Sequence, residues 1–316
     1  MPIPDSDNIK GLSLCEDYFY EVGEEVFRRH FGKLYERMAF GLVGDGSECY
    51  GYDDAVSQDH DWGPGFCVWL GKSDYAEWGV RAQQTYDALP KTYLGFPQRK
   101  TSSWGGGRIG VVEISEFYQN FIGSFQPPVA WNEWLLLPES ALAAATNGKV
   151  FRDPLGEFSQ IRQSLLQFYP EDVRLKKIAA RCMTVGREGQ YNFPRAVKRF
   201  EIYAARYAET KFCADALSLV FLLNKRYAPF YKWTHRAVGE LPILGSYFFG
   251  AVGDLLKEDR YEHKIGRIEE MTQALIGELQ RQGLSSCRSD FLPDSGPDIL
   301  KKIRDKELRS RNILIG

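Results

Sequence analysis

The sequence lacks the features that mark membrane, secreted and duplex-binding proteins. No run of about eighteen apolar residues occurs, so a transmembrane helix is not expected. The N-terminal MPIPDSDNIK has no basic stretch followed by an apolar one, which a secretion signal would have. The formal net charge is only -2, without the basic excess that duplex-binding proteins use against phosphates. We therefore expect a cytoplasmic protein without a membrane span, and nucleic acid is not the expected partner.

Cysteine and histidine are too sparse and too scattered to indicate a metal centre of their own. The six cysteines include no C-x-x-C pair, so neither a zinc site nor a disulfide framework is indicated. Free thiols in a reducing compartment fit this pattern best. Only four histidines are present, and three of them lie far along the chain from His60, in helical context. A histidine-based metallohydrolase is therefore not expected.

Three common catalytic signatures are also missing. The sequence contains no G-x-S-x-G, which marks the nucleophile of many serine hydrolases. Gly44-Asp45-Gly46 is followed neither by the third glycine of G-x-G-x-x-G nor by a Gly-Lys-Ser/Thr. A dinucleotide fingerprint and a P-loop are therefore absent, and any phosphate site must be of another kind.

The length and composition that are present suit a globular protein with two domains. The chain has 316 residues, of which 44% are hydrophobic and 26% charged. Helical and strand patterns alternate up to about residue 130, and helical spacing dominates beyond it. We expect a first domain over residues 1–135 and a second, helical domain over residues 136–316.

Periodicity and helix breakers place the expected elements. Helices are predicted from Ser13 to about His30 and from Asp74 to about Leu89, each with capping-box spacing at its start. Strands are predicted over residues 38–43 and 108–115, and residues 59–70 are predicted to form one strand or two that join at Gly63-Pro64-Gly65. Further helices are predicted around residues 157–183, 191–226, 246–258 and 260–283.

The strongest functional signal is a Gly46-Ser47 pair followed, after eleven intervening residues, by Asp59 and Asp61. In an extended segment, side chains at alternate positions share a face, so both carboxylates would point one way and His60 the other. Two such carboxylates repel unless a divalent cation lies between them, and oxygen ligands favour magnesium. A Gly-Ser turn offers a polyphosphate N–H groups and a hydroxyl. The pattern favours metal-assisted phosphoryl or nucleotidyl transfer, and a solvated acidic turn is the alternative.

A third acidic residue would complete a site for two metal ions. Glu113 is the candidate, because it lies within the apolar RIGVVEIS, where a buried carboxylate is costly unless a cation pairs with it. It could bind metal or act as general base. A structural ion pair with Arg108 is the alternative role, and Glu116 is the fallback candidate for the third acid.

These motifs resemble those of the nucleotidyltransferase superfamily of the DNA polymerase beta type. The residues around them, GSECYGYDDAVSQDHDWGP, further resemble a bacterial group described only as domain of unknown function 4037. The resemblance continues through WLLLPESALAAATNGKVFRD and LNKRYAPFYKWTHRAVGELP. The segment LNKRYAPFYKW is also similar to part of the helical domain of small-molecule antibiotic adenylyltransferases.

The resemblance implies an α+β protein, with a mixed-sheet catalytic domain followed by a helical bundle. It also implies a magnesium-dependent transfer of a nucleoside monophosphate, AMP when ATP is the donor, to a hydroxyl. By this analogy Gly46 and Ser47 hold the terminal phosphates. Asp59, Asp61 and Glu113 then hold two Mg²⁺ ions. Lys225 and Lys232 could neutralise phosphate charge, or could be basic residues on a solvated helix face.

The acceptor is not implied by the resemblance. A small molecule is favoured, because near-neutral charge and 14% aromatic residues suit a pocket for an adenine ring and an organic acceptor. Transfer to protein or tRNA is an alternative, and an inactive nucleotide-binding scaffold or sensor is another. The loop of residues 104–107 could be a lid, an acceptor contact or a surface connection. The helical half could line the acceptor pocket, form a homodimer face, or do both.

Overall fold

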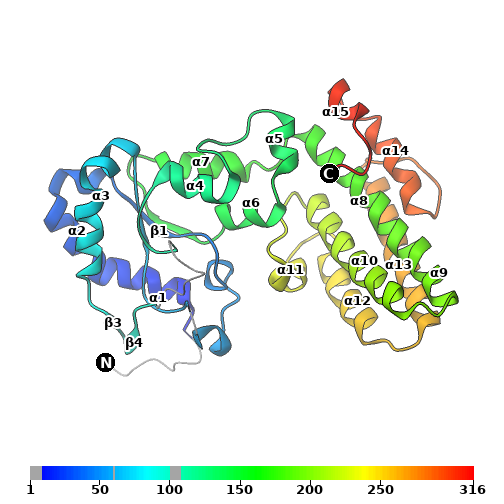
Figure 1. Cartoon of the computed structure of the whole chain (residues 1–316), viewed down its shortest axis with the longest axis horizontal. Coiled ribbons are helices and arrows are strands. Elements are labelled where there is room, and N and C mark those ends of the chain that lie inside the picture. Colours follow the sequence, from blue (N-terminus) through cyan, green and yellow to red (C-terminus); the bar gives the residue numbers. More distant parts are fainter. Residues whose placement is uncertain (1–8, 60, 100–107) are drawn as a thin grey trace. The chain divides into compact units, whose positions relative to one another are not determined.

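The structure is a computed structural model that describes residues 9–59, 61–99 and 108–316. His60 and the loop of residues 104–107 lie outside the described residues. The chain divides into two compact units (Figure 1). The first comprises Met1–Pro127 and Ala141–Gln167, and the second comprises Pro128–Ser140 and Phe168–Gly316. These units do not follow a single cut in the sequence such as the expected one between residues 135 and 136.

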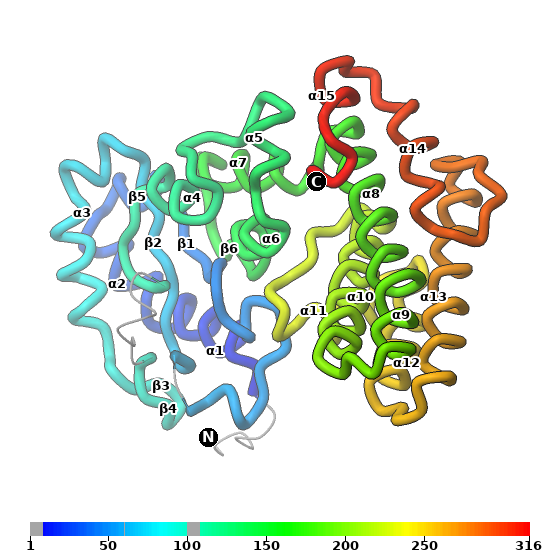
Figure 2. Tube along the Cα trace, turned by 45° about the vertical axis from the view of Figure 1, so that its right-hand side comes forward, coloured from blue at the N-terminus to red at the C-terminus, as the bar shows by residue number. Residues whose placement is uncertain are grey.

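The first unit is built on a four-stranded mixed sheet. Its strands are β1 (Ala39–Leu42), β2 (Cys67–Leu70), β5 (Gly110–Glu113) and β6 (Lys149–Arg152), in the order β5-β2-β1-β6. Figure 2 shows these four strands side by side. Strand β1 is antiparallel to both β2 and β6, whereas β2 and β5 are parallel. A separate short hairpin is formed by β3 (Thr92–Tyr93) and β4 (Phe96–Pro97).

Helices supply apolar side chains to both faces of this sheet. One face is covered by a helical run that consists of α1 (Gly11–Tyr18), a π-helical turn (Phe19–Gly23) and α2 (Glu24–Phe31). From this run, the rings of Phe19 and Phe27 pack on Phe40 of β1, with centroid distances of 4.7 Å for Phe19 and 5.4 Å for Phe27. On the other face, Trp69 of β2 stacks on Phe158 at 3.7 Å. Successive strand residues point to opposite faces, so a continuous apolar strand such as CVWL can serve both layers.

The remaining helices of the first unit follow the strands. They are α3 (Lys72–Asp87), α4 (Ile114–Ile122) and α7 (Glu157–Leu166), while α6 (Glu139–Thr146) contributes residues to both units. Phe117 of α4 lies 5.5 Å from Trp69 and 5.1 Å from Phe158, ring to ring. These contacts extend the core on the face of the sheet that carries Trp69.

The second unit is helical in its described part. Two long helices, α8 (Glu171–Gly186) and α10 (Ile202–Leu223), pack along each other with fully buried Ile178 and Leu219. A buried guanidinium fixes their register, because Nε of Arg174 donates to the carbonyl of Leu222 at 2.9 Å. The other elements are α5 (Trp131–Leu136), a π-helical turn (Arg187–Asn192), α9 (Phe193–Lys198), α11 (Tyr231–Val238), α12 (Gly245–Lys257), α13 (Tyr261–Arg281), α14 (Ser295–Leu300) and α15 (Lys306–Ser310).

The predicted α+β fold class, a mixed sheet followed by a helical bundle, is confirmed. The strand prediction over residues 59–70 is wrong for Asp59 and for residues 61–66, because β2 begins only at Cys67, where pairing with Gly41 starts. Strand β6 was not predicted from the helical pattern of the second half. None of the helices in the described ranges has both the length and the apolar character needed to cross a membrane.

Candidate active site

The pairing of the strands decides which predicted residues meet. Gly41 of β1 is opposite Cys67 of β2, and Cys67 is opposite Gly110 of β5. The end of β1 therefore lies at the same edge of the sheet as the beginnings of β2 and β5. The Gly46-Ser47 turn follows β1, and Asp61 precedes β2, so both segments reach this edge.

The surroundings of Gly11, at the start of α1, show that these two segments lie close together. A Cβ added to Gly11 would lie 2.6 Å from Nε1 of Trp62 and 2.9 Å from Cβ of Glu48. Trp62 directly follows Asp61, and Glu48 directly follows Ser47. The structure therefore brings the segment of the Gly-Ser turn and the Asp61 segment together beside Gly11, a position with no room for a side chain.

Asp59 and Asp61 do not lie on a strand, which corrects the prediction that alternation places them on one face. Asp59 is exposed and ends a 3₁₀ turn, Ala55–Asp59, whereas Asp61 is buried with a φ of +51°. The turn forms because Oδ1 of Asp54 accepts the backbone N–H of Val56 at 3.0 Å and of Ser57 at 3.1 Å. Local capping thus competes with an extended conformation here.

Arg108, which the sequence suggested as an ion-pair partner of Glu113, lies instead beside Asp61. Its Nη1 lies 3.4 Å from Oδ2 of Asp61, so its partner is Asp61 and not the suggested Glu113. Among the residues that the structure describes, no three His, Cys, Asp or Glu side chains are grouped to hold a metal ion.

Glu113 lies at the other end of the sheet. It is the last residue of β5, opposite Leu70 at the end of β2, and it precedes α4 directly. Asp61 instead contacts Arg108, two residues before β5 begins. The structure therefore does not bring Glu113 together with Asp61, and its predicted place in the same metal site has no support in this geometry. The fallback candidate, Glu116, is exposed on the first turn of α4.

The Gly46-Ser47 turn has a conformation that requires glycine. Gly46 has a φ of +139°, and a Cβ there would lie 2.6 Å from Oε1 of Glu48. The Ser47 carbonyl accepts the backbone N–H groups of Tyr50 at 3.1 Å and Tyr52 at 2.9 Å. The turn is thus fixed by backbone bonds, with the Glu48 carboxylate lying against it.

A buried ion pair behind this turn was not foreseen from the sequence. Nη2 of Arg99 lies 2.6 Å from Oε1 of Glu48, and the two side chains are only 1% and 2% exposed. Burial raises the pKa of the nearby Cys15 thiol to about 11, although the Arg99 charge lowers it in part. Asp53 is also buried, and its Oδ2 accepts the Gly11 N–H at 2.6 Å. The one indication of this ion pair in the sequence was the acidic Glu48 directly after the proposed phosphate-binding pair Gly46-Ser47.

Lys225 and Lys232 belong to the second unit, and both are exposed. Lys225 has a φ of +53°, and its Nζ lies 3.8 Å from Oε2 of Glu171. Nζ of Lys232 lies 5.9 Å from the ring of Trp233. Their predicted role toward phosphate stays a prediction.

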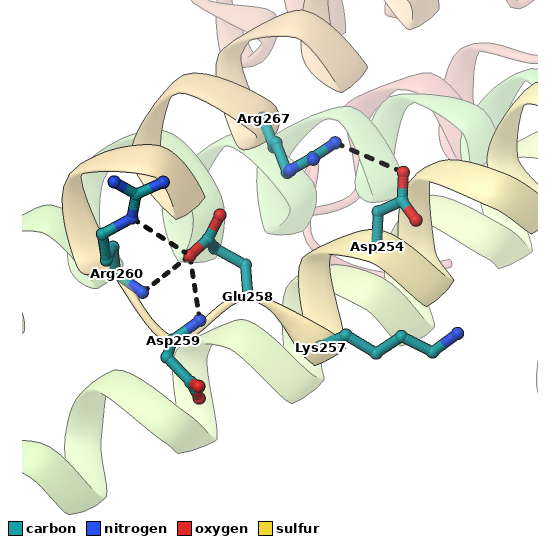
Figure 3. A pocket seen from close by; sticks show the side chains of 6 residues that line it. All are labelled: Asp254, Lys257, Glu258, Asp259, Arg260 and Arg267. Atoms are coloured by element: carbon teal, nitrogen blue, oxygen red, sulfur yellow. Dashed lines mark hydrogen bonds and ion pairs between the residues drawn. The ribbon is translucent and has the colours of Figure 1, made fainter.

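A surface hollow of about 520 Å³ in the second unit, shown in Figure 3, has charged walls. Oε1 of Glu258 accepts the backbone N–H groups of Asp259 at 3.0 Å and Arg260 at 2.9 Å. Oδ2 of Asp254 lies 3.4 Å from Nη1 of Arg267. These carboxylates close the turn between α12 and α13, so the hollow is explained by the structure of that turn.

Comparison with known proteins finds a family model that matches part of the chain. Residues 134–234 match the family model described as Domain of unknown function (DUF4037). The predicted resemblance to this family is confirmed over these residues. The DUF4037 match begins at the tryptophan of WLLLPES and includes LNKRYAPFYKW, and it does not include the Gly46-Ser47 turn or Asp61.

One solved structure that is similar to the chain is the crystal structure of a nucleotidyltransferase-like protein from Exiguobacterium sibiricum 255-15. The two sequences are 13% identical, and the alignment covers 88% of this chain and 78% of that one, with a TM-score of 0.35. A likeness at this level carries no argument about activity. No curated protein matches the sequence.

Proposed function

We propose that the protein is a metal-dependent nucleotidyltransferase, which moves a nucleoside monophosphate, AMP from ATP, to a hydroxyl of a small-molecule acceptor. The observation that carries the proposal is that the residues directly after the Gly46-Ser47 turn and after Asp61, Glu48 and Trp62, meet beside Gly11 at one end of the sheet. A phosphate-binding turn and a cation-binding carboxylate must be neighbours if one Mg-nucleotide is to contact both.

The Gly46-Ser47 turn suits the phosphates. Ser47 is half-buried and supplies a hydroxyl, and Gly46 has a positive φ that residues with a side chain rarely adopt. Arg99 offsets the charge of Glu48 behind the turn, so the turn does not present an unpaired carboxylate to an incoming anion. Arg108, beside Asp61, adds a cation at the same edge.

Asp61 is the carboxylate at this edge that would hold a magnesium ion arriving with the nucleotide. Magnesium is usually held by one or two carboxylates together with substrate phosphates, so we propose Asp61 as one protein ligand and the exposed Asp59 of the same segment as the second. A preformed site for two ions that includes Glu113 does not fit, because Glu113 is at the other end of β5. When bound, the ion would neutralise charge on the pyrophosphate leaving group.

The residues of the chain then act by holding and orienting. Before the cation binds, Arg108 offsets the negative charge of Asp61 and keeps the carboxylate at this edge. Gly46 and Ser47 fix the terminal phosphates. Holding donor and acceptor in position supplies much of the acceleration in such transfers, because little covalent chemistry is required of the protein.

Pyrophosphate release from ATP, measured with magnesium and a panel of hydroxyl compounds, tests this function. Asp59→Asn and Asp61→Asn should each lower the rate by about 100-fold or more, since the charge stabilisation by a metal is worth several kcal/mol. Asp54→Asn is the matched control, because it is an exposed acid of the same loop and asparagine can still cap the 3₁₀ turn. If Asp59→Asn and Asp61→Asn released pyrophosphate as fast as Asp54→Asn does, the assignment of Asp59 and Asp61 as metal ligands would be refuted.

A nucleotide-binding scaffold without transfer activity is the second candidate. It is favoured by the finding that no group of three metal-ligand side chains exists among the described residues. The scaffold predicts Mg-ATP binding that depends on Ser47, with no pyrophosphate release for any acceptor. The same assay, combined with a binding measurement, separates the two functions.

A further inference from the structure

The second unit contains a pocket of about 540 Å³ that no function described so far uses. Its walls come from the start of α6, from α8, α10, α11 and α12, and from the segment that precedes α11. All of its lining residues belong to the second unit, and most of them fall within the DUF4037 match. We call it the helical-unit pocket.

Most of the wall of this pocket is apolar. Leu217 of α10 and Val252 of α12 are buried beside it, whereas Leu256 is 54% and Phe230 50% exposed where they line it. Large apolar side chains this exposed leave surface that a ligand with an apolar body can cover. The volume lies within the range of sites that enclose small organic molecules.

A fixed polar group also lines the pocket. The Ser218 hydroxyl donates to Glu139, 3.1 Å from each carboxylate oxygen, and accepts from Nε of Arg181 at 3.0 Å. Nη2 of Arg181 lies 3.8 Å from Oε1 of Glu139, and Nη1 donates to the carbonyl oxygen of Gly316 at 3.0 Å. A carboxylate and a guanidinium have more acceptor and donor positions than one hydroxyl fills.

Charged side chains of both signs surround this polar group and face one another. Glu139 is opposed by Arg181 and also interacts with the buried Lys177, and Asp215, 4.0 Å from Nε of Arg181, is paired with Lys211 at 3.2 Å. Nε2 of His235, which also lines the pocket, lies 2.9 Å from the carbonyl of Phe249, so in the neutral ring Nε2 carries the proton and Nδ1 can accept. Because these charges already face partners, the pocket favours a neutral head group over a charged ligand such as a phosphate.

We propose that the helical-unit pocket binds a neutral, ring-bearing small molecule whose hydroxyl or amide head both donates and accepts hydrogen bonds. The ring lies against Leu217, Val252 and Phe230, and the head group contacts Glu139 and Arg181. This site is additional to the nucleotide site, and its existence does not depend on nucleotidyl transfer.

Fluorine NMR with the whole protein tests the pocket, using 4-fluorobenzamide, fluorobenzene and 4-fluorobenzoate as probes. Fragments of this size bind in the millimolar range at best, so titration to about 5 mM is needed. Fluorobenzamide should bind several-fold more tightly than fluorobenzene, which has no head group, and than the benzoate anion.

Ala214→Trp should abolish this binding, because Ala214 lines the pocket from an exposed position of α10, where a larger side chain fills it without entering the core. Ala204→Trp, an exposed alanine of the same helix outside this pocket, should bind as wild type does. Leu256→Ala, which removes a half-exposed apolar side chain from the pocket wall, should weaken binding two- to fivefold. Circular dichroism confirms the fold of each variant.

Unchanged fluorobenzamide affinity in folded Ala214→Trp would overturn the proposal, as would the absence of binding to wild type at 5 mM. Equal affinity for the amide and for fluorobenzene would overturn the proposal that the polar head group of the ligand contacts Glu139, Ser218 and Arg181. Loss of pyrophosphate release with pocket binding intact would instead bear on the nucleotide site, so the two proposals fail separately.

Discussion

Arg99→Met should destabilise the first unit strongly, because it leaves the Glu48 carboxylate buried without its cation. The two side chains are 1% and 2% exposed and lie 2.6 Å apart, so water cannot replace the lost partner. Removing one member of such a pair costs about 3–5 kcal/mol. Replacing both members by apolar side chains of similar length, in Glu48→Met/Arg99→Met, should cost no more than about 1 kcal/mol, because no buried charge remains.

Native-state hydrogen exchange with peptide resolution measures this directly. A loss of 3–5 kcal/mol corresponds to exchange that is roughly 10² to 10³ times faster or more, at about 1.4 kcal/mol for each factor of ten. The effect should appear in peptides of β1, β2 and α1, whereas peptides of α8 and α10 in the second unit are the internal control.

The double variant decides the cause. If Arg99→Met exchanges less than fivefold faster than wild type, the pair is not a buried charge pair of the kind that the geometry indicates. If the double variant is as unstable as Arg99→Met, the loss arises from packing and not from the unpaired carboxylate. Either result would refute the reasoning.

Three further predictions concern the turn, the thiols and the α12–α13 connection. Gly46→Ala should lower stability by more than about 1 kcal/mol in urea unfolding, because of its positive φ and the nearby Glu48 carboxylate, whereas Gly266→Ala, with open space inside α13, should raise it by about 0.5–1 kcal/mol. Iodoacetamide at a pH of about 8 should label Cys287 and leave the five buried cysteines unlabelled, because burial shields those thiols and raises their pKa. Mass spectrometry counts the labels, and labelling of a buried cysteine before Cys287 would contradict this prediction. Backbone hydrogen bonds lower the pKa of Glu258 from 4.5, so its contribution to the start of α13 is complete above that pH and is lost as the pH falls through its folded value. Exchange at this turn should therefore rise, relative to the intrinsic rate, on acidification, and Glu258→Gln should remove the dependence while Glu262→Gln does not.

Much of the fold could be predicted because periodicity acts locally. The run from Ser13 to His30 is helical, and the apolar residues 38–43 and 108–115 contain β1 and β5. The missed strand, β6, is no shorter than β1 or β5, but its sequence KVFR has only two apolar residues between two charged ones, so no apolar run marks it within the helical background. Its place in the sheet is decided by pairing with β1, a contact between distant segments that local patterns do not contain.

The candidate site could be predicted in part. The motif predicted that the Gly-Ser turn and Asp61 belong together, and strand order places both at one edge. The predicted strand conformation of Asp59 and Asp61 is wrong, because a cap at Asp54 forms a 3₁₀ turn before Asp61, and a turn was the alternative that the acidic sequence had left open. Glu113 does lie on a strand, β5, that pairs with β2, as predicted. Its distance from Asp61 depends on the register between these two strands, which the sequence alone does not reveal.

Calorimetric titration of a non-hydrolysable ATP analogue into the protein, with and without magnesium, tests whether this end of the sheet holds a nucleotide site. Wild type and Asp54→Asn should bind the analogue only when magnesium is present. Asp59→Asn/Asp61→Asn should lose this binding while its circular dichroism is unchanged. Equal, magnesium-dependent binding by the double variant, or no binding by wild type, would contradict the assignment of a nucleotide site to this edge of the sheet.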